Sequence, residues 1–173
     1  MATAPWGCGK LGRMKIPSPV LLGWLLASAC ATTSFSASTA AHVEREKGKD
    51  FQDKAAHEPD AVRTESGLIY QELQAGTGPS PYAADIVMVH YRGTTIDGKE
   101  FDSSYRRGEP EMFPLGDVIR CWTEGLQRMK VGGKARLVCP PELAYGDHGA
   151  PPDIAGGATL IFDVELVDIP KSP

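Results

Sequence analysis

The chain has 173 residues, 42% of them apolar, a size and composition typical of a globular protein with one core and some extension. All 22 acidic residues follow Val43, so the chain after residue 41 carries 15 basic and 22 acidic side chains, a net charge of −7. A domain with this excess of negative charge is poorly suited to neutralising phosphates, which argues against nucleic-acid binding.

Residues 1–30 have the pattern of a secretory signal peptide. Basic residues up to Lys15 precede a run of 14 mainly apolar residues, 16–29, that ends in small side chains. A helix needs about 20 residues to span a bilayer, so we expect export and no retained membrane span. Met14 offers a second start, because a chain beginning there would have a more compact signal peptide.

The end of this segment leaves two processing outcomes open. Ala27-Ser28-Ala29 fits the small-x-small rule for cleavage, whereas Cys30 after Ser-Ala resembles a bacterial lipoprotein site. Ala27 stands where the lipoprotein pattern usually has Leu, so we favour soluble export to the periplasm. Lipidation of Cys30 would instead anchor the domain to a membrane, such as the outer membrane.

Residues 31–63 are rich in Ser, Thr and Ala and then in charged residues, which predicts a flexible tether. A short helix over residues 44–56 fits the pattern, but Gly48 interrupts it and Phe51 is its only large apolar side chain. Such a helix would bury little surface. We therefore predict that the folded domain spans residues 64–170.

Within that domain, several segments have the periodicity of strands. Residues 68–73 and 86–91 are short strand candidates, and β-branched and aromatic side chains dominate the second. In residues 135–139 and 160–166 every second residue is apolar, which predicts two strands with one buried face each. Asp97-Gly98 tolerates positive φ at both positions and predicts a hairpin between the segments on either side.

One short amphipathic helix is expected between these strands. Apolar residues from Ile119 to Met129 recur at helical spacing, with Asp117 placed to cap the start and Gly132 to end the helix. Several antiparallel strands and a single helix can bury their apolar faces only if the helix packs on the apolar face of the sheet. We therefore predict an α+β fold of two layers.

The segments with aromatic side chains contain little reactive chemistry. They include no nucleophile paired with a base, no Gly-x-Ser-x-Gly elbow, no phosphate-binding loop and no Cys/His set at metal-ligand spacing. The four histidines, at positions 42, 57, 90 and 148, have no mutual spacing that suggests a metal. We therefore set a hydrolase aside, expect no metal, and infer an apolar enclosure beside one carboxylate.

Seven segments carry a family resemblance: Val89–Gly93, Asp97–Ser104, Arg107–Pro110, Val118–Leu126, Met129–Gly133, Pro141–Gly146 and Thr159–Leu166. Their order and spacing resemble the FKBP-type peptidyl-prolyl cis/trans isomerases, most closely the bacterial exported group that includes the macrophage infectivity potentiator proteins. The resemblance covers residues 64–169. It implies a twisted antiparallel β-sheet wrapped around one short α-helix, with a hydrophobic pocket for proline between them.

The resemblance also implies a function and its residues. The expected activity is isomerisation of prolyl peptide bonds in folding proteins, without a cofactor, and inhibition by macrolides of the FK506 and rapamycin type. The matching catalytic positions are Tyr91, Asp102 and Tyr145. The matching substrate contacts are Phe101, Phe113, Val118, Ile119, Trp122 and Phe162, with Trp122 as the pocket floor. Relatives with long N-terminal helices dimerise through them, whereas the short segment here favours a monomer.

Some positions depart from the family pattern. Glu111 stands where some relatives carry a further pocket aromatic, and Asp153 and Ala155-Gly156 change the loop that overhangs the pocket, residues 147–157. Substrate preference and inhibitor affinity are the properties that these changes affect. The alternative function is a peptide-binding chaperone that keeps the pocket but has lost turnover.

Cys121 and Cys139 form a candidate disulfide. Most relatives have Gly at the first position; here Cys121 starts the expected helix and Cys139 faces it from the sheet. Export favours a bridge, which would contribute about 3 kcal/mol by restricting the unfolded chain. Two buried free thiols are the alternative, and the sequence leaves both open.

Overall fold

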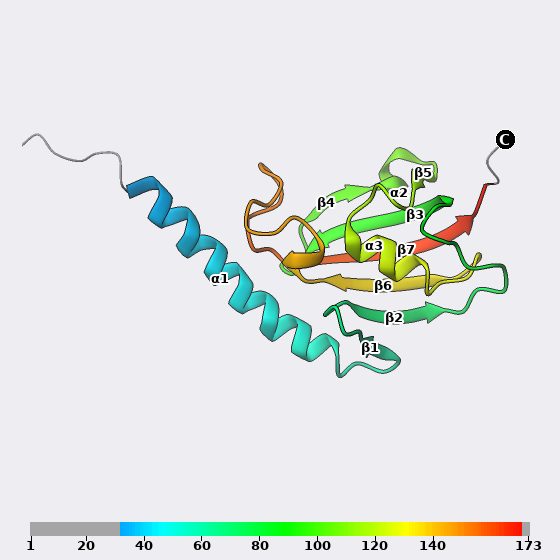
Figure 1. Ribbon diagram of the computed structural model, residues 1–173, viewed down its shortest axis with the longest axis horizontal. Coiled ribbons are helices and arrows are strands. Elements are labelled where there is room, and N and C mark those ends of the chain that lie inside the picture. The colour runs from blue at the N-terminus through cyan, green and yellow to red at the C-terminus, as the bar shows by residue number, and fades with distance from the viewer. Residues whose placement is uncertain (1–31, 171–173) are drawn as a thin grey trace, which may run out of the picture. The chain divides into compact units, whose positions relative to one another are not determined.

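A twisted seven-stranded antiparallel sheet curves around one short helix in the computed structural model, which describes residues 32–170 (Figure 1). The strands are β1 (Ala61–Arg63), β2 (Ile69–Gln74), β3 (Ile86–Thr95), β4 (Glu100–Ser103), β5 (Glu111–Pro114), β6 (Lys134–Cys139) and β7 (Leu160–Asp168). The helices are α1 (Thr32–Ala55), α2 (Ser104–Arg107), α3 (Arg120–Leu126) and the 3-10 turn η1 (Pro141–Leu143). The predicted α+β fold is confirmed.

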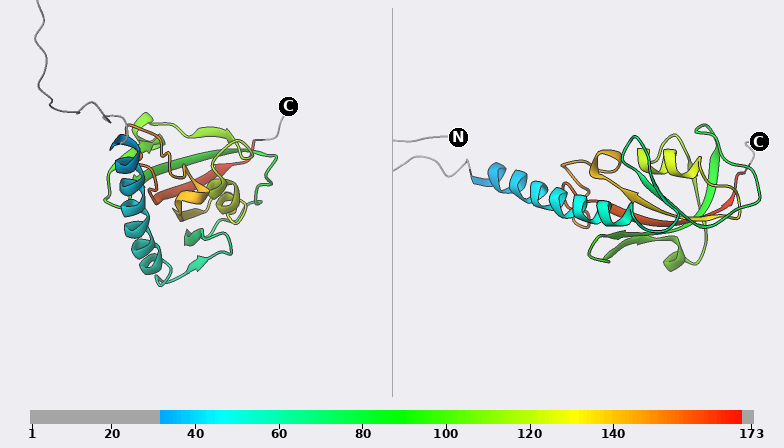
Figure 2. Two further views of the ribbon diagram at one scale, coloured as in Figure 1. Left: turned by 60° about the vertical axis from the view of Figure 1, so that its left-hand side comes forward. Right: turned by 90° about the horizontal axis from the view of Figure 1, so that it is seen from below.

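The strand order is β1-β2-β6-β7-β3-β4, and β5 pairs with β3 beside this path. Burial alternates along β7, where Leu160, Phe162 and Val164 are buried and the residues between them are only partly so. This is the period-2 pattern expected of a strand with one face on the core. The core therefore lies between this face and α3, which Figure 2 shows on one side of the sheet.

The hairpin around Asp97-Gly98 is confirmed, with a different turn from the one the dipeptide predicts. The Gly98 N–H donates to Thr95 O at 2.9 Å, and the Thr95 N–H donates to Lys99 O at 3.0 Å. Gly98 has a positive φ of 80°, whereas the φ of Asp97 is not positive. One positive φ fits a three-residue loop with a bulge better than a two-residue turn.

Helix α3 is confirmed in place but is shorter than the predicted periodicity. It begins at Arg120, after Ile119, and no side chain caps its first turn. Asp117 is therefore not the helix cap that the sequence suggests. Gly125 lets the helix approach the sheet, because a Cβ there would lie 2.7 Å from a methyl carbon of Leu137.

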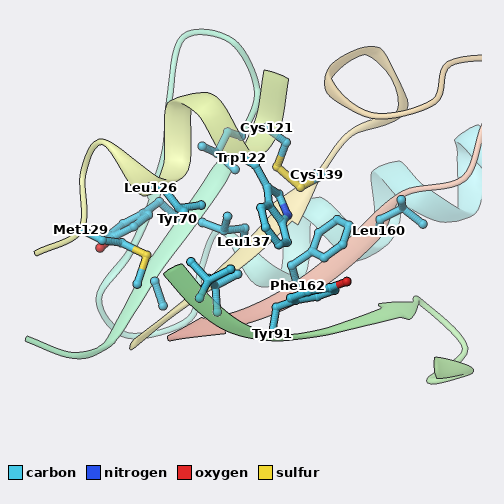
Figure 3. Packing of buried hydrophobic residues seen from close by; sticks show 14 of the residues in the cluster. Tyr70, Tyr91, Cys121, Trp122, Leu126, Met129, Leu137, Cys139, Leu160 and Phe162 are labelled. Carbon is cyan, nitrogen blue, oxygen red and sulfur yellow. A yellow bond between two sulfur atoms is a disulfide. The ribbon is translucent and has the colours of Figure 1, made fainter. Parts of the chain in front are cut away.

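A disulfide joins α3 to the sheet (Figure 3). Cys121, in the first turn of α3, is bonded to Cys139 at the end of β6, with their Cα atoms 5.7 Å apart. Both cysteines are fully buried in the same cluster as Leu126, Leu137 and Leu160. The bond therefore ties the N-terminal end of α3 to the strand beneath it.

Residues 32–63 do not form the flexible tether that the sequence predicts. Residues 32–55 are the helix α1, and β1 continues the sheet at its edge. Near the end of α1, Ala55 packs with Ile69 and Val138 on the face of the sheet opposite α3. The helix has few apolar side chains, and contacts with residues distant in sequence stabilise it.

The predictions for residues 1–30, including the signal peptide, the alternative start at Met14 and lipidation at Cys30, lie outside the described residues. Over residues 32–170, no helix combines the length and the apolar character that crossing a bilayer requires.

Candidate functional site

A pocket of about 330 Å³ opens beside α3 on the concave side of the sheet. Its lining residues are Tyr91, Phe101, Asp102, Phe113, Asp117, Val118, Ile119, Trp122, Tyr145 and Phe162. Every residue that the family resemblance assigns to the pocket is among them. Asp117 is the one lining residue that the sequence analysis does not assign to the pocket, because its position before the helix suggests a cap. The signal that could have identified it is a lone carboxylate between two segments that line the pocket.

Trp122 forms the centre of an aromatic box (Figure 3). It is only 4% exposed, and its ring meets those of Tyr91, Phe113 and Phe162 edge to face, at centroid distances of 5.0, 5.6 and 5.4 Å. Phe101 meets Phe162 in the same way at 5.6 Å. Edge-to-face contacts are the preferred geometry of aromatic pairs, so the walls of the box hold one another in place.

A glycine makes one wall of the box possible. A Cβ at Gly93 would lie 2.6 Å from the Phe101 ring and 3.0 Å from the Phe162 ring. Gly93 is on β3, opposite Phe162 on β7 and Asp102 on β4. Its missing side chain therefore lets the two phenylalanines close over the strand.

A polar network forms another wall. The Tyr91 hydroxyl donates to Asp102 Oδ2 at 2.5 Å, and Glu111 Oε2 offers a second acceptor at 3.0 Å. Arg107 donates to Asp102 at 2.6 Å, to the Tyr91 oxygen at 2.7 Å and to Glu111 at 2.9 Å. Its guanidinium carbon lies 5.5 Å from the centroid of the Tyr91 ring. One cation therefore serves both carboxylates and orients the tyrosine.

This network sets the charge states of its members. Burial alone would raise the pKa of Asp102, but hydrogen bonds from Tyr91, Arg107 and the Ser103 N–H outweigh it and hold that pKa below its usual value. Burial, followed by the hydrogen bond to Asp102, raises the pKa of the Tyr91 hydroxyl. At neutral pH the wall therefore consists of an ionised carboxylate, a neutral phenol and a guanidinium.

We expect any activity that depends on this wall to change less than about twofold between about pH 5.5 and 9 for an uncharged ligand. Asp102 stabilises the folded network above its ordinary pKa near 4, and this contribution is lost as the pH falls through the lowered pKa of the folded state. Tyr91 contributes below its ordinary pKa near 10, and this contribution is lost as the pH rises through the raised value. A pH profile of kcat/KM checks this; a midpoint near pH 7 would contradict it.

Tyr145 stands at the pocket mouth and is 41% exposed. Within residues 32–170 its hydroxyl has no hydrogen-bond partner, and the buried Trp122 Nε1 also has none. The Tyr145 hydroxyl is therefore available as a donor to a bound peptide. The pocket offers an apolar box, a fixed polar wall and this free donor, an arrangement that encloses a ring and holds the adjoining backbone.

A second cavity, of about 230 Å³, lies between α1 and the opposite face of the sheet. Two arginines line it, but Arg136 already pairs with Asp163 and Arg92 with Glu100. The charge of each guanidinium is therefore already balanced by a carboxylate. The aromatic box is therefore the better candidate for the functional site.

A family model described as FKBP-type peptidyl-prolyl cis-trans isomerase matches residues 78–167. The FKBP-type peptidyl-prolyl cis-trans isomerase FkpA of Escherichia coli is 53% identical over 127 residues, which are 73% of this chain and 47% of that protein. The peptidyl-prolyl cis-trans isomerase Mip of Coxiella burnetii is 45% identical over 126 residues, 73% of this chain and 55% of that protein. The chain thus spans about half the length of the curated relatives it matches.

Two solved structures share the fold. The crystal structure of FkpA from Escherichia coli aligns with a TM-score of 0.78 and 48% identity, covering 81% of this chain and 65% of that one. The peptidyl-prolyl cis-trans isomerase of Pseudomonas syringae pv. tomato aligns with a TM-score of 0.71 and 36% identity, covering 76% of this chain and 96% of that one. The second comparison matches almost the whole of a solved isomerase.

Proposed function

We propose that this chain, which belongs to the FKBP-type peptidyl-prolyl cis-trans isomerase family, catalyses the cis/trans isomerisation of prolyl peptide bonds. The observation that carries the proposal is the aromatic box around Trp122, which the polar wall of Tyr91 and Asp102 completes. The substrates are proline-containing segments of folding proteins, and the reaction needs no cofactor because no bond is made or broken.

The apolar box can lower the barrier to rotation about the prolyl amide. Rotation costs about 18 to 20 kcal/mol because amide resonance is lost, and prolyl bonds are those in which both isomers are appreciably populated. The planar amide is more dipolar than the twisted one, so an apolar pocket that grips the proline ring disfavours the planar form. A 1000-fold acceleration requires only about 4 kcal/mol of preferential stabilisation.

The polar groups hold the substrate during this rotation. The Tyr145 hydroxyl, free at the pocket mouth, donates a hydrogen bond to the peptide backbone next to the proline. Asp102 is fixed by Tyr91 and Arg107, and its negative charge responds to the shift of charge within the amide as resonance is lost. Because these groups are already oriented, little reorganisation is needed when the amide twists.

Replacing Asp102 with Asn should lower kcat/KM for a proline peptide about tenfold, and replacing Tyr145 with Phe about threefold to tenfold. The first change removes the negative charge to which Tyr91 and Arg107 donate, and the second removes a neutral hydrogen bond; hydrogen bonds to charged and neutral groups contribute about 1.5–3 and 0.5–1.5 kcal/mol. A protease-coupled isomerisation assay measures both. Tyr82→Phe, at a tyrosine that is 77% exposed and outside the pocket, is the matched control and should have no effect. Unchanged rates in the two pocket variants would refute these roles.

The alternative of a non-catalytic chaperone depends on the changes near Glu111 and Asp153. In the structure Arg107 pairs with Glu111 at 2.9 Å, and Lys99 pairs with Asp153 at 3.1 Å. Neither departure therefore leaves an unpaired carboxylate in the aromatic box, which favours the isomerase. Isomerisation kinetics separate the two functions, because the chaperone would bind a proline peptide without accelerating its exchange.

The proposal extends to location and partners. The signal-like residues 1–30 and the bacterial relatives support export to the periplasm, in soluble form or with a lipid anchor at Cys30. Macrolides of the FK506 and rapamycin type are the proposed inhibitors, because they would occupy the same aromatic box. We propose a monomer, since α1 packs on the sheet of its own chain; light scattering of the purified protein tests this state.

A further inference from the structure

The loop that carries Tyr145 runs beside α1. We define residues 144–159, which connect η1 to β7, as the pocket loop. Tyr145 lies at its start and lines the pocket. Figures 1 and 2 show α1 passing alongside this loop, and contacts between the two join residues about 100 positions apart in sequence. The helix therefore contacts the part of the chain that overhangs the site.

The pocket loop contains no helix or strand. Its one β-bridge joins Ala150 and Ile154, and three further backbone hydrogen bonds, donated by Gly149, Gly157 and Ala158, lie within it. Three of its glycines, at positions 146, 149 and 157, have positive φ, so they lose much conformational freedom when the loop is ordered. A loop of this composition keeps a single conformation only if other elements contribute contacts that offset this entropy.

Arg45 of α1 provides such contacts on both sides of Tyr145. Its Nε donates to Asp147 Oδ1 at 2.8 Å, and its Nη1 donates to Glu142 Oε1. Glu142 is in η1, just before Tyr145, and Asp147 follows shortly after it. One guanidinium therefore holds the two sides of the short segment that presents the tyrosine.

The backbone of α1 also fits closely against the far end of the loop. A Cβ at Gly157 would lie 2.3 Å from the carbonyl oxygen of Ala41, and a Cβ at Gly48 would lie 2.2 Å from Thr159 Oγ1. The Gln52 side chain donates to the same Thr159 hydroxyl at 2.9 Å. Gly48, which weakens the helix in the sequence pattern, is thus the residue that allows this approach.

We infer that α1 holds the pocket loop in its substrate-binding conformation and that Arg45 is a positioning residue for Tyr145. This inference rests on the proposed isomerase function. When Arg45 is removed, the loop samples other conformations and only a fraction of molecules can bind substrate. The apparent KM is divided by that fraction, whereas the rotation in a correctly bound complex is unchanged.

The test uses the whole protein with Arg45→Ala, Arg45→Lys and, as a matched control on α1, Lys49→Ala. Within residues 32–170 Lys49 forms an ion pair with Glu46 of the same helix and none with the loop, so its loss removes a charge from α1 without breaking a contact of Arg45. We expect Arg45→Ala to raise KM about threefold to fivefold with kcat unchanged, as the loss of two partly exposed ion pairs would. The KM of Arg45→Lys should lie between those of Arg45→Ala and the native protein, because lysine has no planar fork with which to reach both carboxylates.

Hydrogen exchange and calorimetry provide readouts that do not need turnover. Amide exchange of Gly149 and Ala150, whose N–H groups bond within the loop, should accelerate about threefold to fivefold in Arg45→Ala and stay unchanged in Lys49→Ala. Calorimetry with the proline peptide should show the same factor in the dissociation constant. Unchanged exchange, or faster exchange with unchanged KM and peptide affinity, would overturn the inference while leaving the isomerase function intact.

A native protein that binds the peptide without isomerising it would overturn the proposed function, and the peptide affinities would still decide the role of Arg45. A native protein that neither binds nor isomerises the peptide would overturn both.

Discussion

Replacing Trp122 with leucine is expected to lower kcat/KM for a proline peptide about 30-fold. Trp122 contacts three aromatic walls of the pocket, and its indole is part of the lining that a proline ring would meet. Truncating a buried aromatic at the centre of a binding site costs about 2 kcal/mol or more, and about 1.4 kcal/mol corresponds to a factor of ten. Leucine keeps the site apolar, so the effect reports lost shape rather than a new polar group.

The control for this variant is Leu126→Ala, one turn further along α3. Leu126 is fully buried but does not line the pocket. Its truncation should lower the free energy of unfolding by about 2–5 kcal/mol and leave kcat/KM within about twofold at a temperature where the variant is folded. Comparable losses of kcat/KM in both variants would show that Trp122 acts through stability alone, which would contradict its place in the site.

Removing the disulfide with Cys121→Ala and Cys139→Ala together is expected to lower the free energy of unfolding by about 3 kcal/mol. The bond closes a loop with a sequence separation of 18 residues, and the chain-entropy model gives about 3 kcal/mol for a loop of this length. For a chain of this size the midpoint of thermal unfolding should fall by about 10 °C. Calorimetric or spectroscopic melting of both proteins measures this difference.

The reductant response of the same two proteins separates the bond from the packing of its atoms. A reductant present during unfolding should lower the melting midpoint of the native protein toward that of the variant and leave the variant unchanged. Equal midpoints for the two proteins without reductant would show that the bond adds no net stability. At a temperature where both are folded, kcat/KM should stay within about threefold, because Trp122 keeps its aromatic neighbours.

The strands and the pocket could be predicted from sequence because their signals are local or follow a family pattern. The alternation of Leu160, Phe162 and Val164 specifies which face of β7 is buried, and the same alternation reappears in the structure. The pocket residues come from six separate segments, yet their order and spacing resemble one family closely enough to assign each position. Periodicity alone would not have brought Trp122 and Tyr145 together.

Helix α1 could not be predicted because its stabilising partners are far away in the chain. Its own sequence is mostly small and polar, contains Gly48, and has few large apolar residues, namely Phe35, Val43 and Phe51, so local signals favour a tether. Arg45 finds Asp147 at a separation of 102 residues, and Gln52 finds Thr159 at 107. Such contacts depend on the tertiary fold and leave no periodic signal in the segment itself.

Two carboxylates near the pocket also differed from their sequence interpretation. Asp117 precedes the helix, as a cap would, but α3 begins three residues later and the side chain lines the pocket. Glu111 stands where some relatives carry a further pocket aromatic, and its effect depends on Arg107, which pairs with it at i,i+4 across the turn after α2. In both cases the sequence identifies the carboxylate but not the groups that surround it in the fold.

Exchange spectroscopy by NMR on a proline peptide, with and without the purified protein, measures prolyl isomerisation directly. The uncatalysed exchange of such a bond takes tens of seconds. Catalytic amounts of protein should bring this exchange to well under a second, in proportion to protein concentration, and Trp122→Leu should remove most of the acceleration. Exchange that stays at the uncatalysed rate while the peptide is bound would show that the pocket binds proline without isomerising it.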